Sequence, residues 1–125
     1  MTEIAYVDDN QDCLDVIQSA FEDLDIKIDT YNDAIQFYNL NKEYKLVISD
    51  FDMPGLNGQD FITILKDKFP KTKTIIYSGI ADQIKIENLS IDSFLLKPLE
   101  FDSLLKVVKY LLFEYNKQEQ KQAEV

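Results

Sequence analysis

Five short apolar runs alternate along the chain with segments of helical periodicity, and this alternation constrains the fold more than any other feature. The runs occupy residues 4–7, 26–30, 46–49, 74–77 and 94–96. Between and after them, apolar residues recur at intervals of three and four, the spacing that gives a helix one apolar face. The alternation predicts an α/β fold: a doubly wound, five-stranded parallel sheet covered by five helices.

Polar groups follow four of the five predicted strands. In an open parallel sheet, ligands bind beyond the carboxyl ends of the strands, so these groups are the candidates for a functional site. They are three carboxylates, one hydroxyl and one ammonium group: Asp8, Asp9, Asp50, Ser78 and Lys97. Because the carboxyl ends of parallel strands lie at one edge, we expect the five groups to converge although they are far apart in the chain.

Crowded carboxylates at that edge favour a bound divalent cation. Like charges in a dry site repel and push one group toward neutrality, and a cation removes this cost. Ligands that are all oxygen favour Mg²⁺ over zinc or copper, and Mg²⁺ commonly binds one or two carboxylates together with phosphate oxygens. One carboxylate is then placed to attack a phosphoryl group and form an aspartyl phosphate, with Lys97 and Ser78 as partners for the phosphate oxygens.

Composition removes several competing classes of function. The chain has no histidine and one cysteine, which excludes Ser-His-Asp and Cys-His nucleophiles, histidine zinc sites and an internal disulfide. Its 13 Lys and Arg residues against 23 Asp and Glu give a net charge of −10, which argues against binding to nucleic acid or an anionic membrane. No apolar run approaches the roughly 18 residues of a membrane span, and the first residues lack the basic start of a signal peptide. We therefore predict a cytoplasmic location.

Four short motifs at the ends of predicted strands carry a resemblance to a known family. They are Val7-Asp8-Asp9-Asn10; Leu46-Val47-Ile48-Ser49-Asp50 followed by Met53-Pro54 and Gly58; Ile76-Tyr77-Ser78-Gly79; and Phe94-Leu95-Leu96-Lys97-Pro98. In this order the motifs resemble the receiver domain of two-component response regulators, including the stand-alone chemotaxis type. The resemblance covers residues 3–113 and implies the flavodoxin-like strand order 2-1-3-4-5.

The resemblance implies a role for each carboxylate. Asp50 matches the aspartate that accepts the phosphoryl group, while Asp8 and Asp9 match the acidic pair that holds Mg²⁺. Asp50 itself and the backbone carbonyl of Asp52 complete the implied set of metal ligands.

Three further residues match the group that responds to phosphorylation in this family. Ser78 matches the hydroxyl residue that turns toward the phosphate, Lys97 the lysine that pairs with it, and Phe94 the aromatic residue that swings inward as Ser78 moves. Phe94 lacks the phenolic oxygen that many relatives carry there, so its movement must depend on packing alone. The stretch from Ser78 to Phe94 is about one helical turn shorter than usual, so we expect a short or distorted fourth helix.

The resemblance also implies partners. A sensor histidine kinase or a histidine phosphotransfer protein would donate the phosphoryl group, an unknown downstream protein would read the switch, and phosphorylation could produce a dimer. The absence of histidine fits a phosphoryl group that comes from another molecule. We expect a self-phosphorylating and autodephosphorylating switch rather than a turnover enzyme. Residues 1–115 are predicted to form the receiver domain, and residues 116–125 a C-terminal tail or the start of a linker helix.

Two other functions stay open at this point. Asp50-Phe51-Asp52 imitates the Asp-x-Asp nucleophile and acid of haloacid-dehalogenase-like phosphatases, although Pro54 stands where that family usually has Thr or Val. The second alternative is a pseudo-receiver that acts only as a protein-binding module. Against this second reading, every position at the carboxyl edge holds a chemically competent residue.

Overall fold

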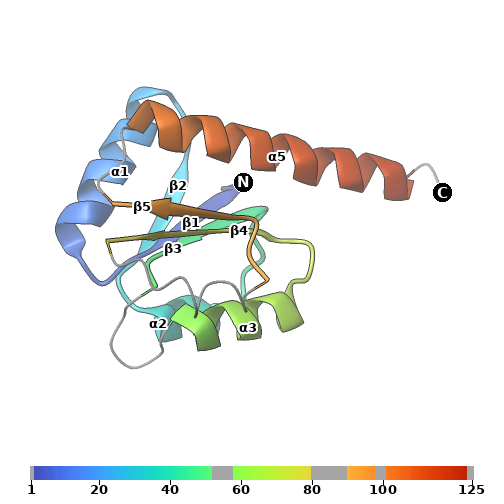
Figure 1. Cartoon of the computed structure of the whole chain (residues 1–125), viewed down its shortest axis with the longest axis horizontal. Helices are drawn as coiled ribbons and strands as arrows, with labels where there is room; N and C mark the ends of the chain where they lie inside the picture. Colours follow the sequence, from blue (N-terminus) through green and yellow to red (C-terminus); the bar gives the residue numbers. More distant parts are fainter. Residues whose placement is uncertain (1, 52–57, 80–89, 98–100, 124–125) are drawn as a thin grey trace.

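The computed structural model describes residues 2–51, 58–79, 90–97 and 101–123, which place helices on both faces of one sheet (Figure 1). The strands are β1 (Ile4–Val7), β2 (Ile28–Tyr31), β3 (Leu46–Ser49), β4 (Lys73–Ser78) and β5 (Ser93–Leu96). The helices in these ranges are α1 (Gln11–Asp23), α2 (Ala34–Asn39), α3 (Gly58–Lys68) and α5 (Phe101–Ala123). The expected short fourth helix falls on residues 80–89, outside the described residues.

The sheet confirms the predicted topology. Its order is β2-β1-β3-β4-β5, and every neighbouring pair of strands is parallel. In the centre, Val7 of β1 is aligned with Tyr31 of β2 and Ser49 of β3. The strands therefore end at the same level, and the residues that follow β1 and β3 meet at one edge. The backbone N–H of Asp50 donates to the carbonyl of Val7 over 2.9 Å, which fastens the two strand ends together.

The core consists of two apolar clusters, one on each face of the sheet. Alternate residues of β1 enter different clusters, because side chains on a strand point to opposite faces in turn. Ile4 and Tyr6 join the cluster beneath α1 and α5, whereas Ala5 and Val7 join the cluster beneath α2 and α3. All four are buried, as expected for a central parallel strand covered on both sides.

Two helices begin at polar capping residues. The side chain of Asn10 accepts a hydrogen bond from the backbone N–H of Cys13 over 3.2 Å at the start of α1. The side chain of Asp33 does the same for Ile35 over 2.7 Å at the start of α2. Each cap satisfies a backbone donor that has no partner inside its own helix. The start of α1 matters most for function because it follows directly on Asp8 and Asp9.

α5 is 23 residues long and runs past the end of the sheet (Figure 1). Beyond residue 115 it keeps contact with the body of the domain: Lys45 Nζ donates to Asn116 Oδ1 over 3.0 Å, and Lys71 Nζ lies 3.2 Å from Glu119 Oε1. Residues 116–123 thus continue the helix, while the domain boundary after residue 115 stays a prediction. Within the described ranges, no helix is both long enough and apolar enough to cross a membrane.

Candidate functional site

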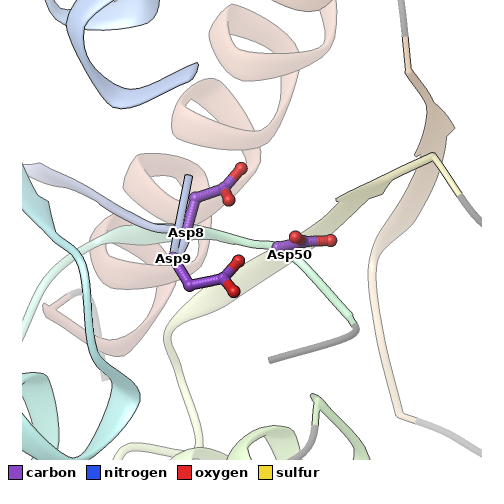
Figure 2. A group of neighbouring side chains, drawn as sticks. All are labelled: Asp8, Asp9 and Asp50. Carbon is purple, nitrogen blue, oxygen red and sulfur yellow. The ribbon is translucent and has the colours of Figure 1, made fainter. Parts of the chain in front are cut away.

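Three carboxylates meet at the carboxyl edge of the sheet (Figure 2). Asp8 and Asp9 follow β1 and Asp50 follows β3, so the parallel register places them together. One oxygen from each of the three lies within 4.8 Å of the others. Asp8 is buried, Asp50 is nearly so, and Asp9 is exposed. The site therefore has a dry inner part and an open outer part.

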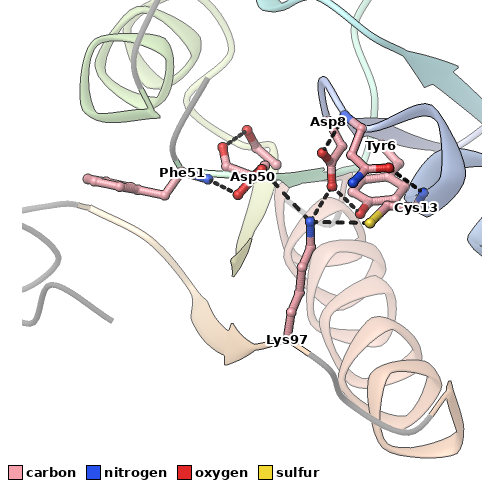
Figure 3. A network of polar contacts seen from close by, with 8 residues as sticks. Tyr6, Asp8, Cys13, Asp50, Phe51 and Lys97 are labelled. Atoms are coloured by element: carbon pink, nitrogen blue, oxygen red, sulfur yellow. Dashed lines mark hydrogen bonds and ion pairs between the residues drawn. The ribbon is translucent and has the colours of Figure 1, made fainter. Parts of the chain in front are cut away.

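Asp8 is the most enclosed of the three and accepts hydrogen bonds from three donors. The hydroxyl of Tyr6 donates to Asp8 Oδ2 over 2.6 Å, and the backbone N–H of Asn10 donates to Oδ1 over 2.9 Å. The ammonium group of Lys97 forms an ion pair with Oδ2 (Figure 3). A buried carboxylate needs several hydrogen-bond donors and an opposite charge, because an unpaired charge in a dry interior greatly destabilises the folded state.

Asp50 lies beside Asp8 in a different electrostatic position. Its Oδ1 accepts the backbone N–H of Phe51 over 2.8 Å, and its Oδ2 lies 3.8 Å from the ammonium group of Lys97. Burial and the charge of Asp8 raise the pKa of the Asp50 carboxyl, and these two causes outweigh the opposite effects of Lys97 and of a hydrogen bond with Ser78. Asp50 is consequently a carboxylate whose charge is incompletely compensated when no cation is bound.

Lys97 reaches the site from the end of β5. Its backbone N–H donates to the carbonyl of Ser78 over 2.8 Å, which extends the β4–β5 pairing to the edge of the site. Burial alone would lower the pKa of Lys97, but the hydrogen bond and charge of Asp8 and the charge of Asp50 raise it above its ordinary value. The lysine therefore carries a positive charge between the two carboxylates throughout the physiological pH range.

The structure brings together five of the seven predicted site residues. These are Asp8, Asp9, Asp50, Ser78 and Lys97. Ser78 is buried at the last position of β4. Phe94 is half-buried and packs against the cluster on the α2 and α3 face, and its expected movement stays a prediction. Asp52 lies outside the described residues, so its expected backbone ligand stays a prediction.

Sequence reasoning missed the aromatic and thiol groups that surround the Lys97 ammonium. Tyr6 donates to Asp8, and the ring centre of Tyr77 lies 5.4 Å from Lys97 Nζ. Cys13 Sγ is 3.7 Å from the same nitrogen, one turn into α1. The available signal was the two-residue period of a strand: Tyr6 lies two positions before Asp8, which directly follows β1, so extended backbone places both side chains on the same face of the sheet.

The donor set fits a hard divalent cation. Three carboxylates offer oxygen ligands and no nitrogen or sulfur, the chemistry that suits Mg²⁺ rather than zinc or copper. Burial, and after it the charge of Asp8, raises the pKa of Asp50 in spite of the nearby lysine. A cation held by Asp8, Asp9 and Asp50 would compensate the negative charge of these carboxylates.

Comparisons with known proteins agree with this geometry. Residues 4–109 match the family described as the response regulator receiver domain. The chain belongs to this family. Its receiver domain is a phosphoryl-accepting signalling switch, and the family match supports that function over the phosphatase that Asp50-Phe51-Asp52 imitates.

Individual relatives are distant in sequence and close in structure. The receiver domain of an HD domain-containing protein from Pseudomonas fluorescens Pf-5 is 26% identical with a TM-score of 0.87, over 93% of this chain and 98% of that one. The regulator TrrA from Thermotoga maritima, in complex with Mg²⁺-BeF, is 26% identical with a TM-score of 0.78, over 89% of this chain and 99% of that one. The probable transcriptional regulator ycf29 of Porphyra purpurea is 28% identical over 104 residues, which are 78% of this chain and 50% of the relative. The chain spans about half the length of the curated relatives it matches.

Proposed function

We propose that Asp50 is the residue of this receiver domain that accepts the phosphoryl group, and that Asp8, Asp9 and Asp50 hold the Mg²⁺ ion that the reaction needs. The observation that carries this assignment is the position of Asp50 within 4.8 Å of two carboxylates and 3.8 Å from a lysine ammonium group. One side chain thereby lies between a cation site and a fixed positive charge.

Asp50 also has the properties of a nucleophile. Burial and the neighbouring charge of Asp8 raise the pKa of Asp50 in the metal-free protein, and a bound cation together with Lys97 would hold the carboxylate ionised, which is the form that attacks phosphorus. The hydrogen bond from the Phe51 N–H fixes Oδ1, and Oδ2 faces Lys97. Because phosphoryl transfer depends mainly on positioning and charge stabilisation, this arrangement supplies most of what the reaction requires.

The transfer itself is a single displacement. An oxygen of the Asp50 carboxylate attacks phosphorus as the bond from phosphorus to the donor's nitrogen or oxygen breaks, and the electron pair of that bond leaves with the donor. A Mg²⁺ ion held by Asp8, Asp9 and Asp50 would supply positive charge that stabilises the negative charge of the phosphoryl group. The presence of Mg²⁺-BeF in the structure of TrrA supports a magnesium site here. The carbonyl of Asp52 would be a further ligand.

Phosphorylation would then rearrange the neighbouring polar groups. A phosphoryl group on Asp50 adds negative charge within reach of Lys97, which at present pairs with Asp8. The Ser78 hydroxyl, buried beside Asp50, would turn to a phosphoryl oxygen. The space that Ser78 vacates would admit the ring of Phe94, so the signal would reach the surface through packing between β4 and β5.

The proposed donor is a sensor histidine kinase or a histidine phosphotransfer protein, since this chain contains no histidine of its own. The downstream partner would be a protein that distinguishes the two states of the β4–β5 edge. We propose that the domain acts through phosphorylation and autodephosphorylation rather than as a turnover enzyme. The cytoplasmic location and a phosphorylation-dependent dimer stay predictions.

Mass spectrometry tests the assignment of Asp50. After incubation with a small acyl phosphate and Mg²⁺, we expect one base-labile phosphate adduct that maps to Asp50. The adduct should be absent from Asp50→Asn and from wild-type protein treated in EDTA. An adduct of equal yield on Asp50→Asn would refute the assignment.

Two further measurements separate this proposal from the alternatives. A chromogenic phosphate ester with Mg²⁺ should give no sustained turnover, because sustained turnover is the behaviour of a phosphatase. Lys97→Ala should still accept phosphate but lose the change in partner binding, since the charge that favours the active geometry is missing. Normal phosphorylation-dependent binding by Lys97→Ala would contradict the role given to this lysine.

A further inference from the structure

The side chain of Tyr6 is a buried phenol that contacts the proposed cation site through Asp8. Tyr6 has no exposed surface, and it lies in β1 between β2 and β3, where its ring packs against Tyr77 at a centroid distance of 6.4 Å. Its hydroxyl donates to Oδ2 of Asp8 over 2.6 Å (Figure 3). Neither charge nor motif at the carboxyl edge accounts for this residue, so its effect on Asp8 needs its own explanation.

The hydrogen bonds of Asp8 can be counted oxygen by oxygen. An ionised carboxylate has about four lone-pair positions, two on each oxygen. On Oδ2, Tyr6 and Lys97 occupy both positions. On Oδ1, the N–H of Asn10 occupies one position. Among the contacts of the described residues, the position that stays available for a cation is therefore on Oδ1.

We propose that Tyr6 is a positioning residue that, together with Lys97, restricts Asp8 in the unphosphorylated protein to binding a cation through one oxygen, and that this restriction favours Mg²⁺ over Ca²⁺. This inference rests on the proposed magnesium site. Mg²⁺ requires near-ideal octahedral geometry and takes carboxylates through single oxygens, whereas Ca²⁺ accepts about six to eight oxygens and often takes both oxygens of one carboxylate. A carboxylate with one oxygen fully occupied can bind Mg²⁺ through its other oxygen but cannot bind Ca²⁺ through both oxygens.

Tyr6 differs from Lys97 in that it stays in place when the switch operates. The proposed activation moves Lys97 toward the phosphoryl group, which would leave Oδ2 of Asp8 with one vacant position. Tyr6 cannot follow, because its ring is buried in the apolar cluster between the sheet and helices α1 and α5, where it packs against Tyr77. Tyr6 would therefore keep Asp8 in one orientation both before and after the movement of Lys97. Lys97 alone could not do so, because it leaves Asp8 when the switch operates.

The test is a pair of binding titrations on Tyr6→Phe. Phenylalanine keeps the ring and its packing and removes only the hydroxyl. Protein freed of metal with EDTA is titrated separately with Mg²⁺ and with Ca²⁺ by isothermal calorimetry at one pH and ionic strength. Loss of an outer hydrogen bond to a metal ligand typically weakens binding by about tenfold or more, and we expect that loss for Mg²⁺. For Ca²⁺ the freed position on Oδ2 compensates, so the preference for Mg²⁺ should fall by at least about threefold.

Tyr44→Phe is the matched control. Tyr44 is also buried, and its hydroxyl donates to the carboxylate of Asp29 over 2.6 Å and forms a second hydrogen bond with the hydroxyl of Tyr31, away from the carboxyl edge. This control removes the same group from a similar hydrogen bond, so it reports any general effect of lost stability. It should keep the wild-type preference between the two cations.

The outcomes are distinguishable. If wild-type protein binds no Mg²⁺, the proposed metal site itself is wrong. If wild-type protein binds Mg²⁺ and Tyr6→Phe loses affinity for both cations by the same factor, or for neither, the selective role of Tyr6 is wrong. Circular dichroism of each variant checks that the fold is intact before the titrations are compared.

Discussion

Removing the charge of Asp50 should make the metal-free protein more stable. The pKa of Asp50 is raised by burial and by the charge of Asp8, so ionising this group is harder in the folded chain than in the unfolded one. A raised pKa in the folded state contributes stability at low pH and loses it as the pH rises through that pKa. Near neutral pH in EDTA, Asp50→Asn should therefore unfold at a higher denaturant concentration than the wild type.

The charges around Asp50 set the magnitude. With an effective dielectric constant of about 20, unit charges 4.8 Å apart interact by about 3.5 kcal/mol, so Asp8 and Asp9, whose oxygens lie within that distance, each repel Asp50 by at least about that amount before screening by solvent. The attraction of Lys97 at 3.8 Å is about 4.4 kcal/mol on the same basis. Since Asp9 is exposed and largely screened, repulsion and attraction nearly cancel, and the cost of burying Asp50 decides the sign. We expect a net gain of about 1 kcal/mol, or roughly 3–5 °C in Tm for a domain of this size.

Unfolding in urea provides the assay. Wild type, Asp50→Asn and the exposed control Asp67→Asn are compared in EDTA between about pH 5 and about pH 8, where carboxyl groups of raised pKa titrate. The advantage of Asp50→Asn should grow with pH, while Asp67→Asn should stay close to the wild type. Saturating Mg²⁺ should reverse the order, because a ligand at about 100 times its Kd stabilises the wild type by about 2.7 kcal/mol.

Two results would refute this reasoning. One is an Asp50→Asn variant that is no more stable than the wild type near neutral pH in EDTA. The other is a gain in stability that does not change with pH, because that gain could not come from the ionisation of Asp50.

Three further substitutions test other parts of the structure by urea unfolding. Lys97→Met leaves buried Asp8 without its cation and should cost about 3 kcal/mol in EDTA and less in Mg²⁺; an equal loss in both conditions would show that the charge is not responsible. Asn10→Ala removes the cap of α1 and should cost about 1 kcal/mol, whereas an unchanged midpoint would mean that water replaces the cap. Leu104→Ala opens a cavity at a fully buried position of α5 and should cost about 2–5 kcal/mol. A loss of less than about 1 kcal/mol, half the lower end of that range, would place this residue outside the rigid core.

Local sequence signals predicted the elements well where one principle dominates. Asn10 and Asp33 mark helix starts because their side chains cap backbone donors, and both helices begin at the next residue. The second strand was predicted from residue 26 but begins at Ile28. The reason is that the N–H of Ile26 donates to the carbonyl of Phe21 over 3.0 Å, so this residue closes the end of α1. An apolar residue that terminates a helix is indistinguishable by pattern from one that starts a strand.

The convergence of the candidate residues at one edge of the sheet was predictable from the sequence, and the contacts among them were not. Parallel strands place the residues after each carboxyl end at one edge, and this rule alone groups Asp8, Asp50 and Lys97. The rule does not say that Lys97 pairs with Asp8 in preference to Asp50, because that choice depends on side-chain reach and burial. It also misses Tyr6, whose ring reads as one more apolar residue of a strand although its hydroxyl is a polar group.

The pairing of Lys97 with Asp8 explains why phosphorylation and cation binding would act together in the proposed switch. With no cation, Asp8 is buried and depends on the lysine, so moving Lys97 away would leave a buried charge uncompensated. A cation held at the carboxylates would remove that dependence, and a phosphoryl group on Asp50 would provide the lysine with about two negative charges in place of one. The movement of Lys97 has two requirements, compensation of the Asp8 charge and a stronger partner for the lysine, and each event alone would meet one of them. A bound cation without a phosphoryl group would release Lys97 from Asp8 but would give the lysine no stronger partner. A phosphoryl group without a cation would give Lys97 a stronger partner, but its movement would leave the buried charge of Asp8 uncompensated. The switch would therefore respond to the two together more strongly than to the sum of each alone.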